Sequence, residues 1–331
     1  MKVDAVRGEL TAALEREVLD HWATHTLLRG GAARQRLEQV VCTLRDDAGR
    51  LIGVGAVDDV VVPLLGGRRF WLYRQSVVPG VADEVADEAD MEMLRHAHAA
   101  LDEEVDQAEG LCVLVEDPQL MQRRRQAVWP GSGLVHVGFL PTGAQVRVRY
   151  FRRSWSSVGD VDLDEGYRIH AFERKGPIPP DHIIQLWKRE TAMDDVEARR
   201  RIGEVVMVAV DRAGEVVGVA TAYRQHNAQL NLDLWYYRTL VANEHRMTNV
   251  AVQLTLRTSQ HLQDRRSGHA ATEPAGVVME VENDGLKRHL PGGLWVTTGF
   301  TYIGTNLRGD HVRVRYFPDA LAPPAPTGSI E

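Results

Sequence analysis

The residues with the clearest chemical potential form a short loop at 246–251, between an expected strand that ends at Val241 and an expected helix. A chain that turns into a helix presents backbone N–H groups without partners, and the helix dipole adds partial positive charge there. Both features favour an anion such as a pyrophosphate. Arg246 and the Thr248 hydroxyl could add phosphate contacts. The alternative is a loop and amphipathic helix that only pack.

Asn249 occupies the loop position at which glycine would best serve an anion site. Glycine permits positive φ and a close approach of the backbone to a ligand. Asn is among the other residues that best tolerate positive φ. We therefore expect the anion site to survive with Asn249, at some loss of affinity.

The elements that must position this loop follow from residue spacing in the second half of the chain. Alternation and breaker residues predict strands at 167–172, 204–210, 215–224, 229–241, 277–281 and 312–317. Helices are expected after a breaker cluster that ends at Asp181, a candidate helix cap, and over 248–263. This order predicts an α/β (α+β) fold, in which a mixed, mostly antiparallel sheet is flanked by helices.

An internal repeat relates the two halves of the chain. Four segments recur in order at offsets of 164 to 166 residues: 49–56 with 214–221, 70–77 with 234–241, 110–117 with 276–283, and 146–151 with the identical 312–317. A Gly-Phe pair, at 138–139 and at 299–300, is expected to precede each last strand. Chance matches would not keep nearly one offset through four segments, so the sequence predicts two tandem modules.

Length and charge set the domain plan and exclude some partners. A chain of 331 residues suits two domains. We expect a first module at 1–151, a linker at 152–165, a second module at 166–318 and a Pro-rich, disordered tail at 319–331. The net charge of −7 argues against wholesale binding to nucleic acid or to an anionic membrane.

Cysteine usage and hydropathy indicate the compartment. Cys42 and Cys112 lie among apolar residues and are expected in buried strands, since their spacing suggests neither a disulfide framework nor a metal site. No apolar stretch reaches the roughly 18 residues of a membrane span, and the N-terminus has no apolar signal core. We expect a cytoplasmic protein without a nucleic-acid or membrane partner, and exposed strand edges would suit a homodimer.

The stretch 239–251 resembles the GNAT superfamily of N-acetyltransferases, in which a strand ending in Val leads into a loop Arg/Gln-x-x-Gly-x-Gly/Ala and then a helix. Arg246 and Ala251 match this loop, and Asn249 replaces its central glycine. The resemblance covers most of 167–317 and, more weakly, the first half. The chain as a whole resembles proteins of two tandem GNAT modules of actinobacterial type.

The resemblance implies acetyl-CoA as cofactor, with its pyrophosphate on the loop. It also implies that the backbone of Leu240 and Val241 pairs with the pantetheine arm, as an added strand pairs with a free edge. Asn283 ends the next strand and is either a polar contact to CoA or a turn residue. The implied cofactor-binding residues are Leu240, Val241, Arg246, Met247, Thr248, Asn249, Val250, Ala251 and Asn283.

Amine acetylation needs a base, donors for the thioester oxyanion, and an acid for the leaving thiolate. By resemblance, the N–H of Val241 is a donor and Asp233 on the long strand is the first choice of base, although a solvated strand carboxylate is the alternative. Many GNAT enzymes carry Tyr where this chain has Trp295. Tyr302 is then the candidate acid, with a packed aromatic side chain as the alternative.

The first half is expected to bind no CoA. Ala82, Val85 and Asp87 correspond to Arg246, Asn249 and Ala251 of the second half. Acidic side chains crowd this helix start, where they suit the helix dipole but repel a pyrophosphate. They are Asp83, Glu84, Asp87, Glu88 and Asp90.

The sequence therefore predicts an acetyl-CoA-dependent N-acetyltransferase that acts on a small-molecule amine by direct transfer in a ternary complex. The departures at Asn249 and Trp295 support an alternative, a catalytically silent GNAT-like protein that binds CoA or a metabolite for sensing or scaffolding. Transfer of a larger acyl group is a third hypothesis. The basic clusters 123–125 and 199–201 are expected to be solvated helix faces, or else contacts to an anionic substrate or to the CoA 3′-phosphate.

Overall fold

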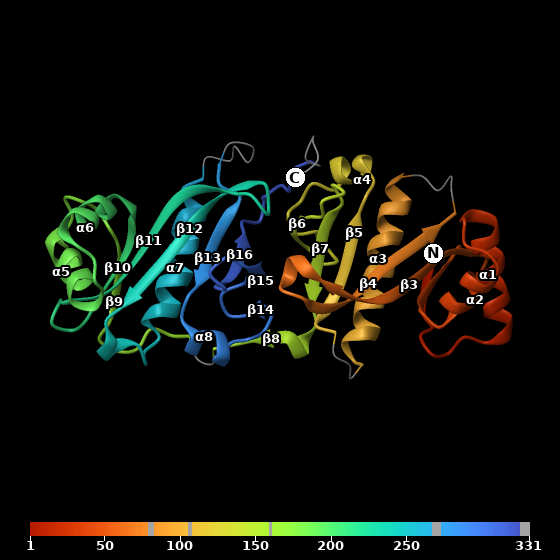
Figure 1. Ribbon diagram of the computed structural model, residues 1–331, viewed down its shortest axis with the longest axis horizontal. Coiled ribbons are helices and arrows are strands. Elements are labelled where there is room, and N and C mark those ends of the chain that lie inside the picture. The colour runs from red at the N-terminus through yellow and green to blue at the C-terminus, as the bar shows by residue number, and fades with distance from the viewer. Residues whose placement is uncertain (79–82, 105–107, 159–160, 267–272, 325–331) are drawn as a thin grey trace. The chain divides into compact units, whose positions relative to one another are not determined.

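The computed structural model describes residues 1–331 except 79–82, 105–107, 159–160, 267–272 and 325–331, and for residues 83–86 it describes only the helical backbone. The chain forms two compact units, one built on Met1–Trp155 and one on Ser156–Ala322. The division between them falls inside the stretch 152–165 that the sequence analysis treated as a linker (Figure 1).

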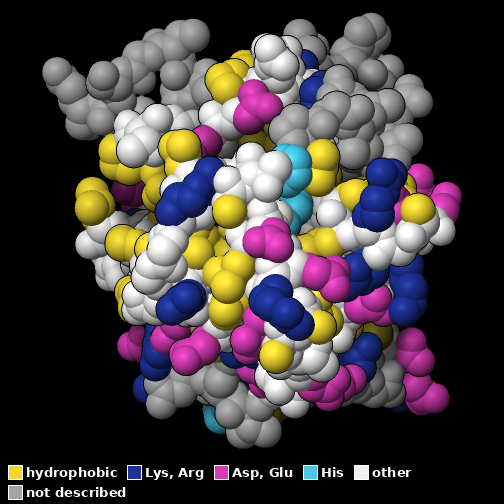
Figure 2. Space-filling model, turned by 90° about the vertical axis from the view of Figure 1, so that its right-hand side faces the viewer, with side chains coloured by type: hydrophobic (Ala, Val, Ile, Leu, Met, Phe, Trp, Pro, Cys, Tyr) yellow, Lys and Arg dark blue, Asp and Glu magenta, His cyan; other side chains and the backbone are white. Residues whose placement is uncertain are grey.

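The first unit is a mixed sheet with the strand order β1-β2-β3-β4-β5-β7-β6. Its strands are β1 (Lys2–Ala5), β2 (Val40–Arg45), β3 (Leu51–Val62), β4 (Arg68–Val77), β5 (Gly110–Val115), β6 (Val135–Phe139) and β7 (Gln145–Tyr150). Its helices are α1 (Ala12–His25), α2 (Gly30–Leu37), α3 (Asp83–Asp102) and α4 (Pro118–Arg123). Figure 2 views the end that carries α1 and α2, where basic and acidic side chains are intermixed.

The sheet of the second unit, whose first strand begins one residue before the unit at Trp155, has the strand order β9-β10-β11-β12-β13-β16-β15-β14-β8. Its strands are β8 (Trp155–Ser156), β9 (Arg168–Ala171), β10 (Val205–Val210), β11 (Val216–Asn227), β12 (Leu232–Val241), β13 (Gly276–Val281), β14 (Leu294–Trp295), β15 (Phe300–Thr305) and β16 (His311–Tyr316). Its helices are α5 (Pro180–Glu190), α6 (Asp195–Arg201), α7 (Val250–Asp264) and α8 (Asp284–His289).

The two sheets repeat one another strand by strand. In each, one pair of strands runs parallel, β4 with β5 and β12 with β13, and the other recorded pairs are antiparallel. Even an irregularity recurs, because the ladder shifts register just before Gly138 on β6 and just before Gly304 on β15. The predicted architecture, two mixed sheets flanked by helices, is confirmed.

One detail of the predicted repeat is wrong. The shared register shift makes Gly138 the counterpart of Gly304, so the pair 138–139 does not correspond to the pair 299–300. Gly299 instead corresponds to Gly133, and both have positive φ, 74° and 68°. A two-residue motif is too short to fix an alignment, whereas the register of paired strands fixes it residue by residue.

Helices cover both faces of the second sheet. On one face, Val250 and Leu254 of α7 pack with Tyr237 and Val241 of β12. On the other face, apolar side chains of α5, among them Trp187, pack against β10 and β11. Because alternate residues of a strand point to opposite faces, β12 contributes to both cores.

Several local expectations need correction. Asp181 lies in the first turn of α5, whose cap is Pro179 without a side-chain hydrogen bond. The segment between the predicted strands 277–281 and 312–317, for which the sequence pattern predicts no element, contains α8, β14 and β15. In the tail, Ala320 and Ala322 are buried, so the expected disorder does not apply to them, and 325–331 lie outside the described residues.

The cysteines are buried as expected, Cys42 on β2 and Cys112 on β5, and both are free. Burial raises the pKa of each thiol to about 12, so neither is a reactive thiolate. Across the part of the chain that the structure describes, no helix combines the length and the apolar character needed to cross a bilayer.

Candidate functional site

The site begins where two parallel strands separate. β12 and β13 pair at Trp235–Val277, Tyr236–Val278 and Tyr237–Met279, and among the described residues the recorded pairing ends there. Beyond that point β12 stays paired with β11 as far as Val241, and β13 stays paired with β16. The facing edges of β12 and β13 therefore leave a gap inside the sheet.

A cavity of about 580 Å³ lies at this gap. Residues 237–240 of β12 and residues 279–283 at the end of β13 line it consecutively. Side chains of consecutive residues in a strand point to opposite faces, so an unbroken run lines one cavity only at the edge of a strand. The cavity consequently lies between the two strand edges and reaches both faces of the sheet.

Elements on both faces complete the lining. From α7 come Ala251, Val252 and Thr255, and from the segment of α5 and α6 come Trp187, Thr191, Met193 and Arg201. Leu286, Leu290, Trp295, Thr297 and Thr298 close a further side. Of the cofactor residues implied by resemblance, Leu240, Ala251 and Asn283 belong to the lining, and Asn283 also caps α8 by accepting from the N–H of Leu286 (2.9 Å).

The loop before α7 is held by its own side chains. Arg246 Nε donates to the carbonyl of Val241 (3.2 Å). Thr248 Oγ1 donates to the carbonyl of His245 (2.6 Å) and accepts from the N–H of Val250 (3.4 Å). Met247 is almost fully exposed. Arg246 and Thr248 would have to turn outward before they could contact a phosphate.

Asn249 does not adopt the positive φ that the sequence analysis expected to be useful here. Its φ is −76°, and it stands immediately before the first turn of α7. Its backbone N–H donates to Oδ2 of Asp164 (2.8 Å), and its Nδ2 donates to the carbonyl of Asp162 (2.9 Å). Gln253 Nε2 donates to the carbonyl of Val161 (2.5 Å). We call the segment 161–164 the strap. The carboxylate of its Asp164 thus accepts a hydrogen bond from one of the backbone N–H groups that were expected to bind the diphosphate.

Neither of the catalytic candidates, Asp233 and Tyr302, lines the cavity. Asp233 lies near the start of β12, where Arg224 (2.6 Å) and His226 (3.2 Å) contact its carboxylate. Chiefly the hydrogen bond from Arg224 lowers the pKa of Asp233, which makes it a weaker base. Tyr302 is buried on β15, with its ring against His311. Trp295 does line the cavity, and its indole N–H donates to the carbonyl of Leu290 (2.9 Å).

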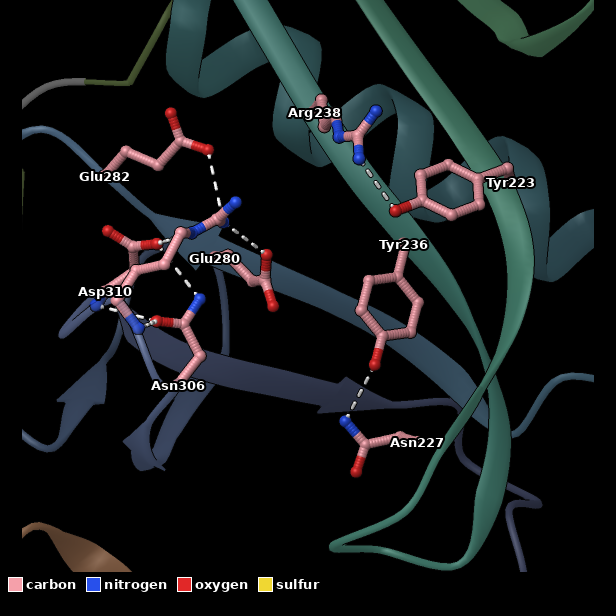
Figure 3. Close-up of polar contacts among 9 residues, drawn as sticks. Tyr223, Asn227, Tyr236, Arg238, Glu280, Glu282, Asn306 and Asp310 are labelled. Carbon is pink, nitrogen blue, oxygen red and sulfur yellow. Dashed lines mark hydrogen bonds and ion pairs between the residues drawn. The ribbon is translucent and has the colours of Figure 1, made fainter.

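Charged side chains that the sequence analysis did not select lie in the cavity wall. Arg308 contacts Glu280 (3.0 Å) and Glu282 (3.5 Å), and its Nε donates to Asp310 (2.8 Å). Arg238 is set apart from this group and donates to the Tyr223 hydroxyl (2.9 Å; Figure 3). The alternation of Glu280 and Glu282 along an apolar strand was the available signal, because both must then point to one face.

The corresponding place in the first unit is filled by an ion cluster. Arg124, the counterpart of Leu290, is buried and donates to Asp87 (2.6 Å) and Asp90 (3.1 Å) of α3. Asp87 corresponds to Ala251, which lines the cavity of the second unit. Ala82 and the side chains of Asp83, Glu84 and Val85 lie outside the described residues. The cluster supports the expectation that this unit binds no CoA.

Comparisons with known proteins give matches among solved structures alone. No family model matches the chain, and no curated protein matches its sequence. A GNAT family N-acetyltransferase (YhbS) from Escherichia coli, in complex with CoA, is 20% identical with a TM-score of 0.32, over 47% of this chain and 84% of that chain. The ribosomal-protein-S5-alanine acetyltransferase from Vibrio fischeri is 12% identical with a TM-score of 0.32, over 48% and 97%.

A third similar structure is the glucosamine-6-phosphate N-acetyltransferase from Arabidopsis thaliana. It is 13% identical with a TM-score of 0.28, and the similarity covers 38% of this chain and 87% of that chain. Each of these structures therefore spans about half of this chain or less, which is the length of one unit.

Proposed function

We propose that the second unit is an acetyl-CoA-dependent N-acyltransferase that uses the gap between β12 and β13 as its cofactor site. The observation that carries this proposal is the cavity of about 580 Å³ at a strand edge inside the sheet. An extended pantetheine arm is an amide chain, so it can hydrogen-bond to a free strand edge as an added strand does. Val241 supplies part of that edge, whereas the backbone groups of Leu240 point to β11, where Leu240 pairs with Val219, so the pairing that the resemblance implies for Leu240 is not available.

The backbone of β12 also suits a developing oxyanion. The N–H of Ala242 donates to the carbonyl of Val217 on β11 (2.8 Å). Backbone groups of neighbouring residues in a strand point to opposite sides, so the N–H of Val241 points toward the gap. A donor placed there stabilises the thioester oxygen as negative charge develops on it. This is the role that the resemblance implies for Val241.

The diphosphate of the cofactor would lie at residues 246–251, where the first amides of α7 and the helix dipole favour an anion. The carboxylate of Asp164 already interacts with the N–H of Asn249. Acetyl-CoA therefore has to displace Asp164, or bind beside it against its charge. Release of Arg246 and Thr248 from their local contacts would compensate in part, through new phosphate contacts.

Glu280 is our candidate for the base, in place of Asp233. It lies on β13 where the strands part, it lines the cavity, and its carboxylate contacts Arg308 (3.0 Å). An acceptor ammonium loses one proton to Glu280, and the neutral nitrogen attacks the thioester carbonyl. The C–N bond forms, the C–S bond breaks, and the second proton passes from nitrogen to the leaving CoA thiolate. The transfer is direct, within a ternary complex.

Calorimetric titration of the full chain with acetyl-CoA tests the cofactor site. We expect one molecule bound per chain. Ala251→Phe puts a ring into the cavity beside the loop and should weaken binding at least tenfold, whereas Arg257→Gln, an exposed α7 residue outside the lining, should not. No binding at millimolar acetyl-CoA, or equal binding by Ala251→Phe, would reject the site.

A second candidate is a silent protein that binds CoA without turnover. The contact between Asp164 and Asn249 favours it, because an internal carboxylate in the anion site limits cofactor occupancy. A thiol-release assay with a panel of amines separates the two hypotheses. Bound acetyl-CoA without acceptor-dependent thiol release supports the silent protein.

A further inference from the structure

Two arginines in the cavity wall, Arg201 and Arg238, have little negative charge near them to balance their own. Arg201, at the end of α6, packs over the Trp187 ring, with its guanidinium carbon 5.6 Å from the centroid. Its Nε is buried and, among the described residues, has no hydrogen-bond acceptor, and the nearest carboxylate oxygen, on Glu204, is 3.6 Å away. Buried guanidinium groups normally have acceptors, so this one is oriented by packing and remains able to bind an anion.

Arg238 provides the second positive charge. Its guanidinium lies 4.7 Å from the Tyr223 ring centroid and donates to the Tyr223 hydroxyl (2.9 Å), a neutral partner. Burial and then the charge of Arg238 lower the pKa of Arg201, so the two cations act on one another. The neighbouring Glu197 is taken up by two hydrogen bonds from Arg200 (2.7 and 2.8 Å). Glu204 is then the carboxylate left to balance the charges of Arg201 and Arg238, so this group of side chains has one positive charge in excess.

Another side of the cavity carries the opposite excess. Glu280, Glu282 and Asp310 each contact the guanidinium of Arg308. Figure 3 labels these three carboxylates. Glu280 and Glu282 line the cavity, as do Arg201 and Arg238. One cavity therefore presents an acidic group of side chains and, separately, a basic pair. This arrangement is complementary to a molecule that carries both charges.

We propose that the acceptor is an amino carboxylate, with its ammonium at Glu280 and Glu282 and its carboxylate on Arg201 and Arg238. The inference rests on the proposed acyl transfer and names its substrate class. The single positive charge in excess matches a carboxylate, a monoanion, better than the dianion of a phosphate monoester. Guanidinium groups bind carboxylates through paired, charge-assisted hydrogen bonds, and Tyr223 positions one of the two.

The test compares acceptors that differ only in the carboxylate. Glycine, β-alanine, 4-aminobutyrate and 6-aminohexanoate are each measured with acetyl-CoA against an alkylamine of matched length, by thiol release from the full chain. We expect at least one amino carboxylate to exceed its amine in kcat/KM by about tenfold to hundredfold, the effect of a charged hydrogen bond. Equal rates for the pairs, or a preference for an aminoalkyl phosphate, would overturn the assignment.

Variants then locate the carboxylate. Arg238→Gln, at an exposed side chain, should remove most of that preference by raising KM for the amino carboxylate. Arg201→Gln should act in the same direction. Arg257→Gln loses one positive charge outside the cavity and should keep the preference. A preference retained in both Arg238→Gln and Arg201→Gln would place the carboxylate elsewhere and refute the proposal.

Failure of the substrate class and failure of the transferase are separable. If acetyl-CoA binds but neither acceptor class releases thiol, saturation-transfer NMR of 4-aminobutyrate and 6-aminohexanoate with wild type and Arg238→Gln decides the matter. A signal in wild type that Arg238→Gln lowers supports the amino-carboxylate site without transfer. No signal in wild type rejects it. Loss of acetyl-CoA binding alone leaves this NMR comparison intact.

Discussion

Glu280 lies at the point where β13 leaves its pairing with β12, in the wall of the cavity. If it takes the proton of the acceptor, Glu280→Gln should lower kcat about 100-fold or more, the usual contribution of a general base. Acetyl-CoA affinity should change little, because the cofactor does not need this proton transfer. Steady-state kinetics and calorimetry on the same preparation measure both quantities.

The matched control for Glu280 is Glu215→Gln, which loses one exposed carboxylate in the hairpin turn after β10. It should retain wild-type kcat. An unchanged kcat in Glu280→Gln would place the base elsewhere. If kcat falls, a residual rate that rises linearly with added small-molecule base would identify proton transfer as the step that the variant has lost.

Single residues were predictable from the sequence where local chemistry decides their position. Leu240 and Ala251 were implied by the resemblance of the strand, loop and helix around them to the GNAT family, and both line the cavity. Asp233 and Glu280 are both strand carboxylates, and the difference between them is tertiary. The hairpin register sets Asp233 opposite His226, whereas the separation of β12 from β13 exposes Glu280. No local pattern encodes that separation.

At the scale of elements, the strap 161–164 decides how open the start of α7 is. The carboxylate of Asp164 accepts a hydrogen bond from the N–H of Asn249. It therefore interacts favourably with the helix dipole, as an anion bound at a helix N-terminus does. A diphosphate at the same amides would be repelled by that charge. Asp164→Asn should therefore tighten acetyl-CoA binding by about twofold to fivefold, the scale of a charge at a helix end.

Calorimetric titration at low salt measures this change, since screening weakens it at high salt. Glu165→Gln removes a neighbouring, almost fully exposed carboxylate and is the control for net charge. Weaker binding in Asp164→Asn would mean that the strap shapes the loop for the cofactor, and the repulsion argument would then be wrong.

Elements with strong periodicity were predicted well, and short ones were not. The long strands β11 and β12 and the helix α7 carry enough alternating or helical positions to be recognised, with ends shifted by a few residues. α8 and β14 span six and two residues, too few to show a period. The strap was treated as part of a linker because its contacts with Asn249 and Gln253 join residues 85 to 92 positions apart.

At the scale of the whole molecule, the same fold occurs twice. The place that holds a cavity in the second unit holds an ion cluster in the first. The repeat was visible in the sequence because strands that pair inside a sheet keep their apolar residues and their lengths. The acidic start of α3 also predicted that the first unit binds no CoA, and the ion cluster around Arg124 is consistent with that prediction. The sequence could not show that Arg124 pairs with this helix start, because its partners Asp87 and Asp90 lie 37 and 34 residues away.

This ion cluster makes the stability of the first unit depend on one guanidinium. Burial raises the pKa of Asp90, and the charge of Arg124 opposes that shift. Arg124→Leu leaves the carboxylate of Asp90 buried without its cation, which should destabilise the first unit by about 3 kcal/mol. Scanning calorimetry of the full chain should show one transition at lower temperature and the other unchanged, because two units need not unfold as one.

The pH dependence of that loss distinguishes the ion cluster from simple packing. Without Arg124 the folded-state pKa of Asp90 rises further, so the folded protein holds the proton more tightly than the unfolded chain does. The stability that protonation gives is then present below the unfolded pKa and disappears as the pH rises through the folded pKa. The deficit of Arg124→Leu should therefore shrink on acidification, whereas Arg125→Leu, at an exposed neighbour, should show no deficit. A deficit independent of pH would mean that Arg124 fills space and that its charge is incidental.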